Sequence, residues 1–114
     1  MRFVDGSGLS QLDRLTAAAL VAVLDALWSD PSLQPTLKRA LPVAGRTGTL
    51  RDRMRAPPLR GKVAAKTGTT SEASALAGFV KGRYVFAILQ NGHPLAYWWA
   101  RKAQDRFATV LAAQ

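Results

Sequence analysis

The first quarter of the chain carries hydrophobic residues at three- and four-residue spacing, which is the pattern of an amphipathic helix. Ser10 is the expected N-cap, and Asp13 completes an approximate capping box. Pro31 is expected to end this helix soon after Trp28. Before the helix, Asp5-Gly6-Ser7-Gly8 predicts a tight turn. The predicted apolar stripe consists of Leu12, Leu15, Ala19, Leu20, Val23, Leu24 and Leu27.

A second, shorter helix is predicted to end before Pro42, because leucines recur there every four residues. These are Leu33, Leu37 and Leu41. Prolines and glycines then gather in residues 42–61, which predicts an irregular, polar excursion on the surface. Leu50 and Met54 indicate one helical turn within it.

Three β-strands are predicted after this excursion, each bounded by turn residues. They span Lys62–Thr67, Ala73–Val80 and Tyr84–Leu89. Lys81-Gly82-Arg83 forms a compact hairpin turn, so the three strands are expected to run antiparallel in sequence order. The first strand then lies at an edge of the sheet, where it needs a partner, a ligand or a cover.

A final helix is predicted to open at Pro94 and to pack one apolar face on the sheet. That face consists of Trp99, Ala103, Phe107, Val110 and Leu111. The order of elements therefore predicts the α/β class, with an antiparallel sheet of three or more strands and helices before and after it. A three-stranded sheet open to helices on both faces is an incomplete layer structure.

The composition is that of a folded chain, since 48% of its 114 residues are hydrophobic. The longest apolar stretch, Ala17–Leu24, is too short to cross a bilayer. Met1–Gly6 has neither the apolar core nor the cleavage site of an export signal. The chain is therefore expected to be either cytosolic or one part of a longer exported protein. With no cysteine, it can form neither disulfides nor thiolate metal sites.

Basic residues dominate the charge: sixteen lysines and arginines face seven acidic residues, for a net charge of +9. Between Arg46 and Lys66, seven residues are basic and only Asp52 is acidic. Such a stretch suits a polyanionic partner, so a nucleic-acid-binding module is one candidate function. No aromatic residue interleaves these arginines to stack on bases, which argues against that candidate.

Several kinds of catalytic site are disfavoured. His93, the only histidine, sits in an Asn-Gly-His-Pro turn without the context of a Ser-His-Asp triad. The single glutamate and the six scattered aspartates show no metal-ligand spacing, and no phosphate-binding glycine loop is present. We therefore expect neither a metal nor an organic cofactor.

Lys66-Thr67-Gly68-Thr69 is the candidate site. It closes the predicted edge strand, so it offers an ammonium group and a hydroxyl group where a ligand can reach them. Gly68 has no side chain, which allows another molecule to approach the backbone closely. The backbone N–H of Thr69 is a candidate oxyanion donor. The alternative interpretation is a strand that simply ends in a turn.

Lys66-Thr67-Gly68 also resembles the third motif of penicillin-binding proteins and serine β-lactamases. Three blocks in family order give a more specific resemblance, to the D-alanyl-D-alanine carboxypeptidase/endopeptidase branch called peptidase family S13. The predicted last helix suits the carboxy-terminal helix of that fold. The blocks are Val4-Asp5-Gly6-Ser7-Gly8-Leu9-Ser10, then Pro42-Val43-Ala44-Gly45 with Gly48-Thr49-Leu50-Arg51, then Gly61-Lys62-Val63-Ala64-Ala65-Lys66-Thr67-Gly68-Thr69 with Leu76-Ala77-Gly78-Phe79.

The resemblance implies that residues 1–114 are the carboxy-terminal part of a transpeptidase-like domain in a serine-type DD-peptidase. In such enzymes a serine attacks the bond between the two terminal D-alanines of a peptidoglycan stem peptide, and water releases the acyl-enzyme. Lys66 would supply positive potential, Thr67 would bind the terminal carboxylate, and Gly68 would keep the strand edge clear. The Thr69 N–H would form half of the oxyanion hole. β-Lactams would occupy the same site, in a parent protein of the periplasmic or extracytoplasmic cell envelope.

Two motifs of the family are absent from the sequence. None of the six serines has a lysine three residues later, and the only asparagine, Asn91, is not part of a Ser-x-Asn motif. Ser7 and Ser10 have no candidate base beside them and are expected to serve as turn and cap residues. The nucleophile, the general base and the second oxyanion donor are therefore expected upstream of Met1, and the isolated chain is expected to be inactive. A serine β-lactamase fragment and a non-catalytic remnant stay as alternatives.

Overall fold

The computed structural model describes residues 2–5, 11–69, 73–91 and 96–114. The elements follow the predicted order, with one strand added at the start. The predicted turn at residues 5–8, the Ser10 cap, the turn at His93 and the helix start at Pro94 fall wholly or partly outside the described residues. The elements are β1 (Arg2–Asp5), α1 (Gln11–Ser29), α2 (Gln34–Ala40), the 3₁₀ turn η1 (Gly48–Leu50), β2 (Val63–Thr69), β3 (Ala73–Val80), β4 (Tyr84–Asn91) and α3 (Tyr97–Ala112).

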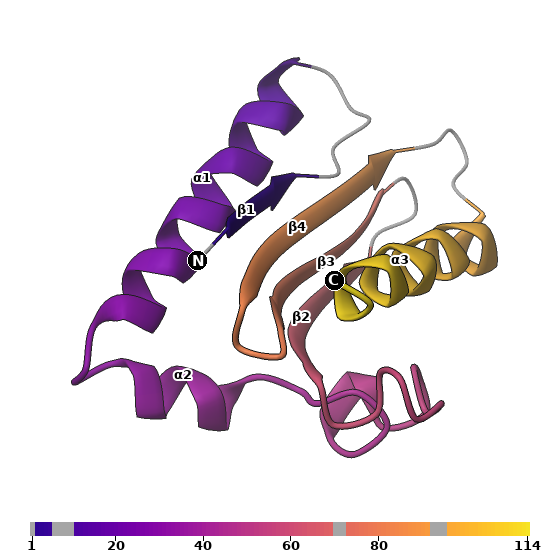
Figure 1. Cartoon of the computed structure of the whole chain (residues 1–114). Helices are drawn as coiled ribbons and strands as arrows, with labels where there is room; N and C mark the ends of the chain where they lie inside the picture. Colours follow the sequence, from indigo (N-terminus) through magenta and orange to yellow (C-terminus); the bar gives the residue numbers. More distant parts are fainter. Residues whose placement is uncertain (1, 6–10, 70–72, 92–95) are drawn as a thin grey trace.

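The strands form one sheet in the order β1-β4-β3-β2 (Figure 1). β2, β3 and β4 pair antiparallel, which confirms the prediction, and β2 lies at one edge. In the turn between β3 and β4, Lys81 and Gly82 have φ of 57° and 65°. Two successive positive φ angles are typical of the turns whose twist matches a β-hairpin.

β1 is a strand that the hydrophobic pattern did not predict. Arg2–Asp5 pairs parallel to β4, with Phe3 beside Val85. A four-residue strand is too short for a period to emerge, and its pairing joins segments far apart in the sequence. The antiparallel prediction therefore holds for three strands and not for the fourth.

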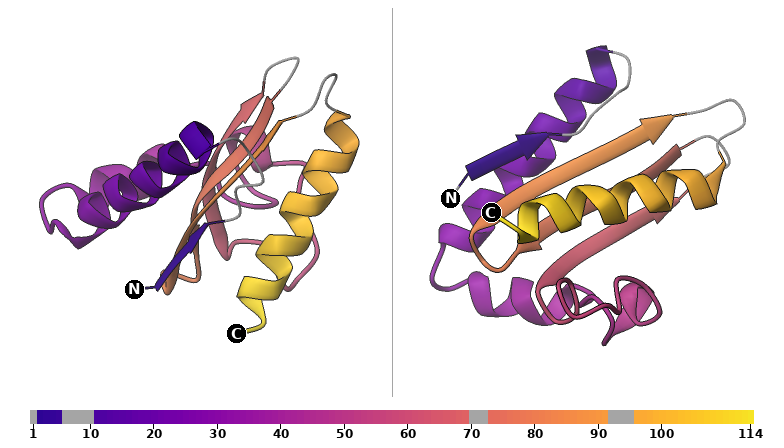
Figure 2. Two further views of the ribbon diagram at one scale, coloured as in Figure 1. Left: turned by 90° about the horizontal axis from the view of Figure 1, so that it is seen from above. Right: turned by 45° about the vertical axis from the view of Figure 1, so that its right-hand side comes forward.

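Helices cover both faces of the sheet: α1 and α2 lie on one face and α3 on the other (Figure 2). Successive side chains of a strand point to opposite faces, so each central strand contributes to two cores. Phe79 and Val85 pack on the α1 side, whereas Val80 and Phe86 pack on the α3 side. Burial on both faces fixes the register, because a slip of one residue would exchange the two sets.

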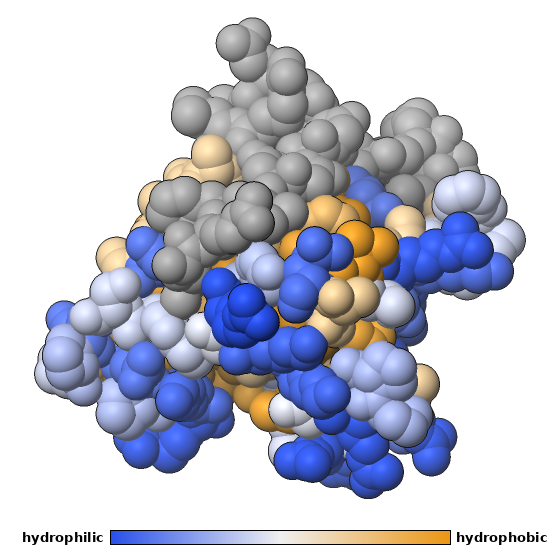
Figure 3. Space-filling model, in the orientation of Figure 1, coloured by the Kyte–Doolittle hydropathy of each residue, from blue (hydrophilic) through white to orange (hydrophobic). Residues whose placement is uncertain are grey.

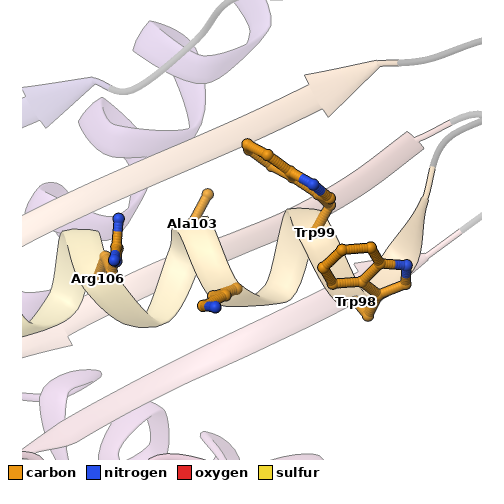
Figure 4. Close-up of a pocket in the computed structure, with 5 residues that line it drawn as sticks. Trp98, Trp99, Ala103 and Arg106 are labelled. Atoms are coloured by element: carbon orange, nitrogen blue, oxygen red, sulfur yellow. The ribbon is translucent and has the colours of Figure 1, made fainter.

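α3 buries a different face from the predicted one. Trp99 and Val110 are 65% and 60% exposed, and Trp98 also lies on the outer surface of the helix (Figure 4). Of the predicted face, Leu111 is buried and Phe107 is partly buried. Small side chains dominate the true buried face, which lets the helix approach the sheet closely. The buried residues of α3 are Ala100, Gln104, Ala108, Leu111 and Ala112.

Gln104 is a polar residue in this core, and its hydrogen bonds explain why it is tolerated. Its Nε2 donates to Ser74 Oγ at 2.9 Å and to Gln90 Oε1 at 3.0 Å. Its Oε1 accepts from the Arg53 guanidinium at 3.2 Å. Because buried amides cost little once they are paired, these three bonds fix the rotation of α3 over β3 and β4.

α1 is also rotated from the predicted stripe. Leu24 is buried and Leu20 partly buried, as predicted, but Ala19 and Val23 face solvent. Ala17 and Val21 take their place against the sheet. The helical period was therefore right and the choice of face was partly wrong.

The excursion of residues 42–61 is anchored rather than loose. Leu50, Met54 and Leu59 are buried in the α3-side core. The predicted helical turn at Leu50 and Met54 is only partly right, because the short η1 ends at Leu50 and Met54 has a φ of 53°. Gly45 N–H donates to the carbonyl of Leu50 at 2.8 Å and to that of Arg53 at 2.9 Å. These contacts hold the excursion beside the start of β2.

Candidate functional site

The outer edge of β2 is half covered by the chain's own segment Pro42–Ala44. The N–H of Ala65 donates to the carbonyl of Pro42, and the N–H of Ala44 donates to the carbonyl of Val63, each at 2.9 Å. This pairing covers residues 63–65 and ends before Lys66. The cover that the sequence required is thus present for one half of the strand. No segment among the described residues pairs with the outer edge of Lys66–Thr69, which is therefore called the open edge.

The backbone of the open half points its hydrogen-bonding groups outward at every second residue. In an antiparallel strand, the N–H and C=O of one residue share a direction that alternates along the chain. The outward bonds of Val63 and Ala65 to the cover fix this alternation. The N–H groups of Thr67 and Thr69 therefore also point away from β3. The N–H of Thr69 therefore lies outside the β2–β3 pairing, and its role as an oxyanion donor stays a prediction.

Lys66 lies exposed on the α1 side of the sheet. It is paired with Ala77, which packs in the core on that side. Its ammonium group donates a hydrogen bond to the outward carbonyl of Thr67, so the charge is held at the strand edge. In the part of the chain that the structure describes, the one ion pair joins Arg53 to Asp105, at 2.7 Å. No described carboxylate therefore neutralises Lys66.

Thr67 lies on the opposite face, half-buried and paired with Leu76. Its hydroxyl group donates to Thr49 Oγ1 at 3.0 Å, which ties β2 to η1. The Lys66 ammonium and the Thr67 hydroxyl thus reach the open edge from the two sides of the sheet. Neither side chain is in the core, which is the arrangement that the predicted site needs.

Gly68 is exposed, and the fold itself does not require glycine there. A Cβ at this position would meet only Ala75 Cβ, at 3.7 Å, which is ordinary van der Waals contact. Gly78, opposite Ala65, is the contrary case, because a Cβ there would lie 2.1 Å from the carbonyl oxygen of Ala64. Close packing thus explains why position 78 is glycine, whereas packing within the described chain does not explain the glycine at position 68.

Charged and polar side chains surround the lower half of the molecule. Hydrophilic residues gather over α2 and over the excursion of residues 42–61 at the lower margin (Figure 3). Arg46, Arg51, Arg55 and Arg60 of this excursion are exposed. An anionic molecule that approaches β2 from this side meets a positive field.

A model of the D-Ala-D-Ala carboxypeptidase 3 (S13) family matches residues 1–114. The chain belongs to this family. The D-alanyl-D-alanine carboxypeptidase of Actinomadura sp. (strain R39) is 43% identical over 120 residues, which cover 95% of this chain and 21% of that protein. Carboxypeptidase DacB of Mycolicibacterium smegmatis is 38% identical, over 96% of this chain and 25% of its own length.

A more distant relative is the penicillin-sensitive carboxypeptidase A of Dictyostelium discoideum, 33% identical over 80% of this chain and 19% of that protein. The chain therefore spans about a fifth to a quarter of the curated relatives it matches. Membership of the S13 family confirms the resemblance drawn from the three sequence blocks. It favours the carboxypeptidase over the nucleic-acid-binding and β-lactamase alternatives.

Two segments beside the candidate site were not assigned a role from the sequence. Thr49, which holds the Thr67 hydroxyl, lies inside the block Gly48-Thr49-Leu50-Arg51, and Pro42–Ala44 opens the preceding part of it. The sequence identified both segments as family blocks, but it did not indicate what either segment does. Their contacts with β2 indicate what they do: Thr49 holds the Thr67 hydroxyl, and Pro42–Ala44 covers part of the strand edge.

A membrane-spanning helix and a metal-binding cluster are both absent from the described residues. No helix among them is long and apolar enough to cross a bilayer. No group of three or more histidine, aspartate or glutamate side chains in that part of the chain is placed to hold a metal ion.

Proposed function

We propose that this chain supplies the substrate-binding strand of a serine-type D-Ala-D-Ala carboxypeptidase acting on peptidoglycan stem peptides. The observation that supports the proposal most directly is the open edge of β2 at Lys66–Thr69, with an exposed ammonium group and outward amides. An extended peptide can pair with such an edge through backbone hydrogen bonds.

The peptide end is anionic, and the edge offers two groups for it. Lys66 provides positive charge that no described carboxylate cancels. Thr67 provides a hydroxyl group whose oxygen is held beside Thr49. When the carboxylate binds, the single proton of Thr67 turns to it, and the Thr49 hydroxyl donates to Thr67 Oγ1 instead. In this proposal both groups bind the terminal carboxylate, and Gly68 leaves the room that the peptide backbone needs.

The reaction proceeds through an acyl-enzyme. A serine hydroxyl oxygen bonds to the carbonyl carbon of the penultimate D-alanine, the C–N bond breaks, and the terminal D-alanine leaves with a proton on its amine. Water then cleaves the ester. The Thr69 N–H stabilises the oxyanion that forms in both steps, a contribution worth ~10²–10³ in rate. β-Lactams acylate the same serine.

The serine and its base are not provided by a Ser-x-x-Lys motif in this sequence. We propose that residues 1–114 form the carboxy-terminal part of a transpeptidase-like domain and that the isolated chain has no turnover. The working enzyme would act in the cell envelope outside the cytoplasmic membrane, where peptidoglycan lies. A continuous reading frame upstream of Met1 that encodes Ser-x-x-Lys would support this arrangement.

A hybrid enzyme tests the proposal. In this hybrid, residues 1–114 replace the matching segment of the Actinomadura carboxypeptidase. It should release D-alanine from a D-Ala-D-Ala peptide and be labelled by a fluorescent penicillin. Lys66→Ala and Thr69→Pro, which removes the N–H from an edge strand that tolerates proline, should each lower kcat/KM by about 10²-fold or more. Lys102→Ala on α3 is the control, and equal activity of all variants would refute the proposal.

A further inference from the structure

A second cationic site lies at the other end of β2. A pocket of about 530 Å³ opens on the α1 side, between α1, α2 and the beginning of β2. Trp28, Lys38, Lys62, Phe79, Lys81 and Gly82 are among the residues that line it. Lys62 directly precedes β2 and is four residues from Lys66, or about 13 Å along an extended chain, so this pocket is separate from the open edge.

Three lysines from three different elements converge on this pocket. Lys62 directly precedes β2, Lys81 lies in the β3–β4 turn, and Lys38 comes from α2. The N–H of Lys81 donates to the carbonyl of Lys62 at 2.7 Å, so the fold holds these two residues side by side. No aspartate or glutamate is among the described residues that line the pocket. Like charges gathered without a counter-charge repel one another, and a bound anion would relieve that repulsion.

The position of Lys81 adds to this argument. Its φ of 57° lies in the left-handed region, where glycine, asparagine and aspartate are the usual residues. The hairpin turn requires this positive φ but not a lysine, which is strained there relative to glycine or asparagine. Such an outlier is a reason to look for a role of the side chain.

An apolar wall completes the site. The rings of Trp28 and Phe79 lie 4.5 Å apart between centroids, tilted by 31°. Lys38 Nζ lies 5.0 Å from the centre of the Trp28 ring, which fixes the ammonium group beside the indole. A Cβ at Gly82 would approach the Trp28 ring to 3.3 Å, so glycine keeps this part of the ring open.

We propose that this pocket binds an organic anion: the three ammonium groups hold a phosphate group, and an attached flat, apolar group packs against the accessible part of the Trp28 ring, which the buried Phe79 supports from the core. The inference does not depend on the carboxypeptidase activity. A pocket of this size with an apolar wall and a few convergent polar groups is typical of a small-molecule site.

Phenyl phosphate, inorganic phosphate and phenol are the probes. In the 114-residue chain carrying Trp98→Phe and Trp99→Phe, Trp28 is the one remaining tryptophan and reports on its own pocket. We expect phenyl phosphate to quench its fluorescence saturably and to bind about tenfold more tightly than inorganic phosphate, with no saturable effect of phenol. Added salt should weaken the binding.

Charge removal then decides the assignment. The double variant Lys62→Gln/Lys81→Asn should raise the Kd for phenyl phosphate by about tenfold or more, and asparagine suits the positive φ at position 81. Lys102→Gln, on the opposite face of the sheet, is the matched control and should leave the Kd unchanged. Circular dichroism establishes that each variant folds. Absence of saturable binding, equal affinity for phenol, or equal loss in the control would overturn the proposal.

Discussion

The hydroxyl group of Thr67 donates a hydrogen bond to Thr49 Oγ1 across 3.0 Å, and so joins the open strand edge to a 3₁₀ turn eighteen residues earlier in the chain. The contact is exposed to solvent, so its contribution to folding is small. In the proposed function the contact matters for orientation: Thr49 holds Thr67 Oγ1 in one rotamer, and it can donate to that oxygen once the Thr67 proton turns to the anion.

Thr49→Val should therefore affect substrate binding in the hybrid enzyme more than it affects stability. We expect KM for a D-Ala-D-Ala peptide to rise about three- to tenfold, the equivalent of about 1 kcal/mol for one hydrogen bond, with a smaller change in kcat. Thr109→Val, which removes a hydroxyl bonded within α3, is the control. An unchanged KM in Thr49→Val would show that Thr67 needs no support.

The two strand glycines should respond in opposite ways to alanine. Gly78→Ala places a Cβ 2.1 Å from the Ala64 carbonyl oxygen, so β2 and β3 must move apart, at a cost of about 3 kcal/mol or more. Gly68→Ala should change the free energy of unfolding by less than about 0.5 kcal/mol, yet reduce carboxypeptidase activity of the hybrid at least about tenfold. Urea unfolding followed by circular dichroism gives the first comparison. Comparable stability losses at both positions would contradict it.

Gln104→Leu should destabilise the chain although it keeps the volume of the side chain. It removes both hydrogen bonds to Ser74 and Gln90 and leaves these groups without that partner in the core, at a cost of about 2 kcal/mol. Gln114→Leu at the exposed end of the chain should cost less than about 0.5 kcal/mol. If the two variants have the same midpoint temperature of thermal unfolding, the buried hydrogen bonds of Gln104 do not contribute to stability.

Arg53 links the excursion of residues 42–61 to α3, and a double-mutant cycle measures that link. The guanidinium lies 2.7 Å from Asp105, and the side chains are 14% and 38% exposed. For Arg53→Ala and Asp105→Ala we expect a coupling of about 1 kcal/mol that shrinks in 1 M salt, because the pair is partly open to solvent. A coupling that salt does not change would show that the two residues interact through packing instead.

Much of the fold could be predicted from the sequence, but helix faces could not. The period of apolar residues identified α1 and α3 correctly, whereas the choice of buried face favoured large side chains such as Trp99 and Val23, which lie exposed. The sheet accepts Ala100 and Ala17 instead, because small residues permit close approach. β1 was missed because its pairing with β4 is purely long-range.

Part of the candidate site could likewise be predicted from the sequence, and part could not. Lys66-Thr67-Gly68 and its position on an edge strand followed from local pattern and turn residues, and the structure places these residues there. The cover at Pro42–Ala44, the support from Thr49 and the lysine pocket at Trp28 required chain segments to meet in space. Nothing in the spacing of the residues could reveal those meetings.

The covered half of β2 sets a limit on what the open half can accept. A peptide that extends β2 antiparallel would run from Thr69 toward Lys66 and would then collide with Pro42, whose carbonyl already holds the N–H of Ala65. Only a chain that terminates at that point fits without displacing the cover. If the proposed function is correct, the intramolecular pairing would exclude a peptide that continues past Lys66, and it would favour a free carboxyl end over the interior of a polymer.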